Sequence, residues 1–197
     1  MSAFQILSGS IRSTIRRSPL TFLRVAVLSS LTAVSPLFAQ SHTMSNDSAR
    51  VPARLTQIVQ QSTKKYLNVN KARSAGYAPF LGCVTGPDQG AMGIHYVNGA
   101  LLNGELNADQ PQALIYEPEG NLLRLVGVEF IVDAATWLKN HNGTPPVLEG
   151  QVLQLVPAPN RFNLPTFFEI HVWAWRNNPN GAFVDWNTRV TCEHEGQ

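Results

Sequence analysis

Two histidines and one glutamate, His95, Glu129 and His171, are the residues whose chemistry best suggests a functional site. Each sits among apolar residues in a segment typical of a β-strand. Because side chains alternate across a strand, His95 shares a face with the small residues Ala91 and Gly93, which leave room beside its ring. Two imidazoles and one carboxylate suit zinc, iron, manganese or copper with open coordination positions. If the three strands are neighbours, the sequence predicts a site for one divalent metal of unspecified identity.

The same three residues are compatible with two other roles. They could line a metal-free pocket for a small polar ligand, or they could be buried for purely structural reasons. A buried carboxylate without a partner costs on the order of several kcal/mol, so Glu129 requires a partner in each case. The spacing of the three residues lacks a local signature such as HExxH. The sequence therefore leaves the metal site, the polar pocket and the structural role open.

The segment 167–176 has two different faces if it is a strand. One face is apolar and typical of a core, and the other carries Phe167, Glu169, His171, Trp173 and Trp175. Glu169 is a candidate fourth ligand, or a partner that orients an imidazole. Tyr96, Trp173 and Trp175 are candidates for an apolar wall that contacts a bound molecule. Exposed tryptophans would also favour an alternative function, a non-enzymatic envelope or secreted binding module for sugar or protein.

The pattern of apolar residues predicts the fold. Helical spacing covers residues 50–66 and a second short piece at 70–75. A period of two predicts strands at 91–97, 113–117, 122–132, 151–156, 167–176 and 182–186, and it places Glu129 on one face with Leu125, Gly127 and Ile131. We expect an α+β fold, in which an N-terminal amphipathic helix packs on a mostly antiparallel sheet or small barrel of five to six strands.

The first 39 residues have the order of a secretory signal peptide. A basic region with four arginines precedes the apolar run Val25–Phe38 and the small residue Ala39. We expect a signal peptide at 1–39, a linker at 40–51 and a single globular domain at 52–197. The protein would then be periplasmic or secreted, without a stable membrane span after cleavage. An uncleaved membrane anchor and a mitochondrial presequence are the alternatives.

Charge and cysteine content are consistent with export. The formal net charge of the chain is +2. Four of its 15 basic residues precede Ala39, whereas the remaining 11 basic and all 13 acidic residues follow it. The domain therefore has no excess of basic residues that would attract nucleic acid. Cys83 and Cys192 are far apart and each lies beside a predicted strand. In an exported chain they predict one disulfide, with two buried free thiols as the alternative.

Several blocks of the chain resemble an uncharacterised family of exported bacterial proteins. The blocks are KARSAGY, AMGIHYVN, LIYEP, LRLVGVEF and HVWAWRNNPNGAFVDWNTRVTC, which together extend over roughly residues 55 to 192. The resemblance implies a bacterial, exported, single-domain protein. It implies no activity, cofactor or catalytic residue.

Overall fold

The computed structural model describes residues 53–86 and 88–195. All of them belong to one compact unit. The predicted signal peptide at 1–39 and the linker at 40–51 lie outside the described residues. No helix in the described ranges is both long and apolar enough to cross a membrane.

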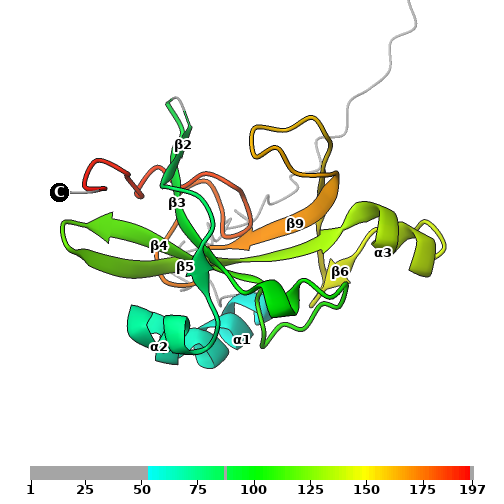
Figure 1. Cartoon of the computed structure of the whole chain (residues 1–197), viewed down its shortest axis with the longest axis horizontal. Coiled ribbons are helices and arrows are strands. Elements are labelled where there is room, and N and C mark those ends of the chain that lie inside the picture. The colour runs from blue at the N-terminus through cyan, green and yellow to red at the C-terminus, as the bar shows by residue number, and fades with distance from the viewer. Residues whose placement is uncertain (1–52, 87, 196–197) are drawn as a thin grey trace, which may run out of the picture. The chain divides into compact units, whose positions relative to one another are not determined.

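The described chain contains a few short helices and a run of strands (Figure 1). The helices are α1 (Arg54–Thr63), the 3-10 helix η1 (Lys64–Leu67), α2 (Val69–Ser74), the 3-10 helix η2 (Gly99–Leu101) and α3 (Ala134–Asn140). The strands are β1 (Ala78–Pro79), β2 (Val84–Gly86), β3 (Gly90–Val97), β4 (Ala113–Glu119), β5 (Leu122–Asp133), β6 (Val147–Leu148), β7 (Gln151–Val152), β8 (Gln154–Val156) and β9 (Phe167–Val172). The predicted α+β class is confirmed.

The main sheet is antiparallel and open. Among the described residues it has seven strands in the order β1-β3-β4-β5-β9-β8, with β2 also paired to β3, so the small barrel that the sequence left as an alternative does not form. The short strands β6 and β7 pair separately. The predicted strand at 182–186 is not a strand, and residues 151–156 are divided between β7 and β8. The central strands β3, β4, β5 and β9 carry the features that matter for function.

One face of the sheet is covered by α1 and α2 and holds the main hydrophobic core (Figure 1). Leu55 and Val59, one helical turn apart on α1, are fully buried and belong to the same hydrophobic cluster as Tyr116 and Phe130 of the sheet. The predicted core face of the last central strand, with Phe168 and its alternate neighbours, belongs to this cluster. Burying this face fixes the register of the strands and therefore fixes which residues face the other way.

The opposite face is covered by the C-terminal segment and by the loop before β9 (Figure 1). Cys83 and Cys192 form the predicted disulfide, with Cα atoms 5.6 Å apart. The bond ties the loop between β1 and β2 to the end of the chain. Glu117 of β4 accepts a hydrogen bond from the backbone N–H of Thr191 on the same side of the sheet. This covered face is the one that carries the ionisable residues.

Candidate metal centre

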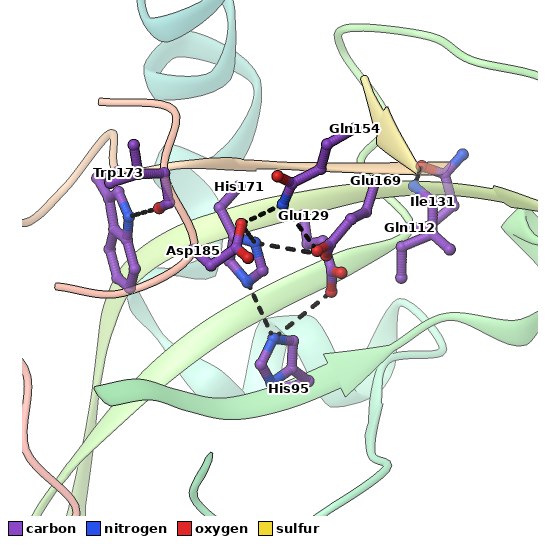
Figure 2. Close-up of polar contacts among 10 residues, drawn as sticks. His95, Gln112, Glu129, Ile131, Gln154, Glu169, His171, Trp173 and Asp185 are labelled. Carbon is purple, nitrogen blue, oxygen red and sulfur yellow. Dashed lines mark hydrogen bonds and ion pairs between the residues drawn. The ribbon is translucent and has the colours of Figure 1, made fainter. Parts of the chain in front are cut away.

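His95, Glu129 and His171 come from three different strands and meet on the face opposite the helices. Glu129 of β5 lies directly opposite His171 of β9 in the strand register, whereas β4 separates β3 from β5. In a flat sheet, strands β3 and β9 would be about 14 Å apart. The Nε2 atoms of His95 and His171 are only 3.4 Å apart, and Figure 2 shows the two rings pointing toward each other. The sheet therefore curls around this face and brings the two rings together.

Two glycines allow the close strand approach beside these residues. Gly93, two positions before His95, has a φ of +100°, and a Cβ there would lie 2.7 Å from the carbonyl oxygen of Tyr116. Gly127, two positions before Glu129, would place a Cβ 2.9 Å from the carbonyl oxygen of Val172. Any larger residue would force these backbones apart. The sequence around each ionisable residue thus shapes the curved face on which it lies.

The three side chains form a compact group of donor atoms. His95 Nε2 lies 3.5 Å from Glu129 Oε2, and one donor atom from each of the three residues falls within 4.8 Å of the others. All three residues are buried. Two ligands bound at about 2.1 Å to one ion are about 3.0–3.4 Å apart. The distances from His95 to the other two residues are close to this range, so these three residues, which we call the donor group, could converge on a single ion.

His171 is shared with a second group on its other side. Its Nδ1 atom lies 3.5 Å from Glu169 Oε2 and 3.8 Å from Asp185 Oδ1, and no hydrogen bond satisfies it. Gln154 donates hydrogen bonds to both carboxylates, at 3.0 Å to Glu169. Glu169, His171 and Asp185 could themselves hold an ion. They also form the arrangement of a carboxylate beside the outer nitrogen of a ligating histidine, which fixes the ring and its tautomer.

Burial moves the pKa values of the cluster toward uncharged forms. It lowers the pKa of His95 to about 4, a shift that the backbone carbonyl of Gly93 partly offsets. Burial, and then the nearby His95, lower the pKa of His171 well below its usual value. Burial also raises the pKa of Glu129 well above its usual range, and the hydrogen bond to Glu169 adds to this shift. Neutral imidazoles are ready to ligate a metal, and a divalent cation would favour release of the Glu129 proton.

Three acidic side chains crowd around two uncharged imidazoles in this cluster. Burial raises the pKa values of Glu169 and Asp185 as well, and the Asp185 side chain keeps 28% of its surface exposed. Without a cation, the carboxylates must stay protonated or repel one another. This unfavourable electrostatic arrangement is what a bound cation would relieve.

Not every residue that the sequence grouped with the histidines lies beside them. Tyr96 faces the helices, stacks edge-on against Tyr116 and receives a hydrogen bond from Arg73. Trp175 also packs on the helix side, where its N–H donates to Thr63. The predicted alternation fails there because the strand ends at Val172.

Trp173 remains on the predicted face, with its ring centroid 6.1 Å from that of His171. It is only 4% exposed and donates its N–H to the carbonyl of Val184. Glu169 lies beside His171, as the sequence predicts. Asp185 and Gln154 are members of the cluster that sequence reasoning missed. Both lie in segments that the period of two predicts as strands, 151–156 and 182–186, but neither side chain was assigned to the histidine face, and only part of the first segment forms the strand β8.

Comparison of the chain with protein-family models, curated proteins and solved structures found no match in any of the three. The resemblance to an exported bacterial family stays a prediction from the sequence blocks. The case for function therefore rests on the geometry of the donor group.

Proposed function

We propose that this protein binds one divalent transition metal through His95, Glu129 and His171. The observation that carries the proposal is the meeting of three buried donor atoms from three strands at ligand spacing. Glu129, Glu169 and Asp185 are buried or half-buried carboxyl groups with raised pKa values, and a bound cation would offset their negative charge, which supports the proposal. Imidazole and carboxylate donors favour zinc and its first-row neighbours over calcium or magnesium.

The centre is of the open type. Structural zinc sites are closed by four protein ligands, whereas catalytic sites use three and leave a position for water or substrate. His95, Glu129 and His171 all line one cavity, so water or a substrate would reach an ion held by them through that cavity. The chemistry that such a centre supplies is Lewis-acid activation of a bound oxygen atom. Glu169 and Asp185 act on His171 from its far side as positioning residues.

Export is part of the proposal. The order of residues in the first 39 positions is that of a signal peptide. The disulfide between Cys83 and Cys192 supports an oxidising compartment, because such bonds are rare in reducing cytosol. We infer a periplasmic or secreted metalloprotein.

Metal affinity in competition with a chromophoric chelator tests the metal site. Wild type should bind one Zn²⁺, and Glu129→Gln should bind it more than 100-fold more weakly, since even outer partners of a ligand contribute 10–100-fold. Glu105→Gln removes an exposed carboxylate and serves as the matched control. Equal affinity of Glu129→Gln and wild type would show that Glu129 is not a ligand.

The same titration separates the alternative functions. If wild type binds no Zn²⁺, Mn²⁺, Fe²⁺ or Cu²⁺ while remaining folded, the metal-free polar pocket becomes the better assignment. The binding module based on a tryptophan-rich strand has less support. Trp173 is buried and Trp175 packs against the helix-side core, so neither indole presents a free face for stacking on a sugar.

A further inference from the structure

The donor group forms one end of a cavity of about 170 Å³. Among the described residues that line this cavity, all except the donor group and Glu169 are apolar. These four polar side chains lie together, so the cavity offers polar side chains at one end and an apolar wall elsewhere. Such a combination is typical of a ligand site, in which the wall supplies affinity and a few polar groups fix orientation.

Part of the apolar wall belongs to a loop whose conformation is fixed by its own hydrogen bonds. Phe162 and Leu164 reach the cavity from the loop between β8 and β9. The side chain of Asn160 accepts hydrogen bonds from the backbone N–H groups of both residues and donates one to the carbonyl of Leu164. The hydroxyl of Thr166 accepts a further bond from the N–H of Ala158 at the start of the loop. This part of the wall is therefore in place without a ligand.

A second part of the wall is held equally firmly. Phe80 and Leu81 line the cavity from the segment between β1 and β2. The N–H of Phe80 donates to the carbonyl of His95 at 2.9 Å, and the disulfide between Cys83 and Cys192 ties the same segment to the end of the chain. A pre-formed wall lowers the entropic cost of binding, because few groups have to be ordered when a ligand enters.

The opening and the volume of the cavity limit the size of a ligand. Phe80 and Leu102 line the cavity, and each keeps 50% of its surface exposed to solvent, so they lie where the cavity opens. A cavity of about 150 Å³ accommodates a benzene molecule. The space beside the donor group therefore fits one six-membered ring or a hydrocarbon of similar bulk.

The apolar wall also limits the polarity of a ligand. Hydroxyl groups directed at this wall would lose their hydrogen bonds to water and gain no partner, which is unfavourable. Removing apolar surface from water at the same wall is favourable. A sugar or another polyol thus fits poorly, whereas a molecule with one polar group can direct that group toward the donor group.

We propose that this cavity binds a small, hydrocarbon-rich molecule of about one six-membered ring. Its body packs against Ile131, Phe162 and Leu164, and its polar group, where it has one, faces the donor group. Size and an apolar body are the properties that the cavity selects. The wall is complete without an ion, so this binding goes beyond the proposed metal function and does not depend on it.

Methyl NMR titration of the protein, with and without Zn²⁺, tests the inference with cyclohexanol and inositol. The two probes share a six-carbon ring, but cyclohexanol has a single hydroxyl group and inositol has one on every carbon. Cyclohexanol should shift the methyl resonances of Ile131 and Leu164 and leave those of the exposed Leu155 unchanged. It should bind at least about 10-fold more tightly than inositol in both forms of the protein. Absence of shifts at Ile131 and Leu164, or equal binding of inositol, would overturn the proposed ligand class.

Two variants that fill the cavity test where the ligand lies. Leu164→Trp adds bulk from the loop and should weaken cyclohexanol binding at least about 10-fold. Ile131→Phe adds bulk from β5 and should have the same effect, which keeps the test decisive if the loop variant does not fold. Leu155→Trp adds bulk at an exposed position of β8 and should leave the affinity unchanged. Wild-type affinity in the folded cavity variants would place the ligand elsewhere and overturn the inference.

The Zn²⁺ titration separates this inference from the metal proposal. If cyclohexanol binds in the cavity and Zn²⁺ does not bind, the metal proposal fails and the cavity inference stands. If Zn²⁺ binds and cyclohexanol binds neither form of the protein, the cavity inference fails and the metal proposal stands.

Discussion

His95→Gln should change how the stability of the metal-free protein depends on pH. Burial lowers the pKa of the folded-state imidazole from 6.5 to about 4. Between these values the unfolded chain binds a proton that the folded protein does not. The free energy of unfolding is therefore unaffected by His95 protonation above pH 6.5, and it decreases as the pH falls toward 4.

The magnitude follows from the size of the shift. One pKa unit corresponds to about 1.4 kcal/mol, so the shift of His95 is worth about 3 kcal/mol. The other buried groups titrate over the same range and partly in the opposite direction, because burial raises the pKa values of Glu129 and Glu169. The difference between variant and wild type cancels the contributions that do not depend on His95. It retains the direct effect of His95 and its effect on the pKa of the adjacent His171.

Urea unfolding from pH 4 to 7, with chelator present and the disulfide intact, measures this difference. The free energy of unfolding of wild type minus that of His95→Gln should be about 3 kcal/mol larger at pH 7 than at pH 4. Met92→Leu, a buried change in the same cavity that removes no titratable group, should give a constant difference. Parallel curves for wild type and His95→Gln would refute the claim that His95 is held neutral by burial.

Three further predictions concern the surroundings of the donor group. Asp185→Asn should weaken Zn²⁺ affinity about 10–100-fold in the same chelator competition, because Asp185 faces the outer nitrogen of the proposed ligand His171; unchanged affinity would remove it from the site. Replacing both Cys83 and Cys192 with alanine opens a loop with a sequence separation of 109 and should lower the free energy of unfolding by about 4–5 kcal/mol. A loss below about 1 kcal/mol would contradict the entropic account. Gly93→Ala should destabilise the protein by more than about 1 kcal/mol and weaken metal binding, because φ is +100° and the carbonyl of Tyr116 blocks a Cβ; wild-type stability and affinity together would contradict the close-approach argument.

Much of the fold could be predicted because the central strands alternate regularly. The period of two identified β3, β4, β5 and the first part of β9, and the helical spacing of Leu55 and Val59 identified a face that is buried. An ionisable residue on an otherwise apolar strand correctly indicated His95 and His171 as candidate site residues. Both side chains face away from the helix-side core and line the cavity.

Irregular backbone explains what the sequence could not reveal. A register shift in the pairing of β4 with β5 leaves Val126 as the extra residue, so Leu125 packs on the helix side instead of beside Glu129. After Val172 the chain leaves the strand, and the N–H groups of Trp175 and Arg176 both donate to the carbonyl of Val126. Alternation cannot be continued through a bulge, because one extra residue reverses every later side chain.

The contribution of Asp185 and Gln154 depends on tertiary structure alone. Asp185 lies in a predicted strand, 182–186, that is irregular in the structure, and Gln154 lies on the short edge strand β8, which has no fully buried face. Asp185 reaches His171 because the segment after β9 covers this face of the sheet, and Gln154 of β8 holds Asp185 and Glu169 through its side-chain amide. The curl of the sheet, which brings the side chains of β3 and β9 together across β4 and β5, also depends on the whole sheet.

The most direct test of the proposed metal centre is the metal content of the protein, purified from cells grown with zinc, iron, manganese and copper. The account predicts about one equivalent of a single divalent metal per chain in wild type and none in His171→Ala. Both proteins should retain the disulfide and a cooperative unfolding transition, which shows that the fold is intact. A folded wild-type protein without stoichiometric metal, or a His171→Ala variant that retains it, would contradict the central claim.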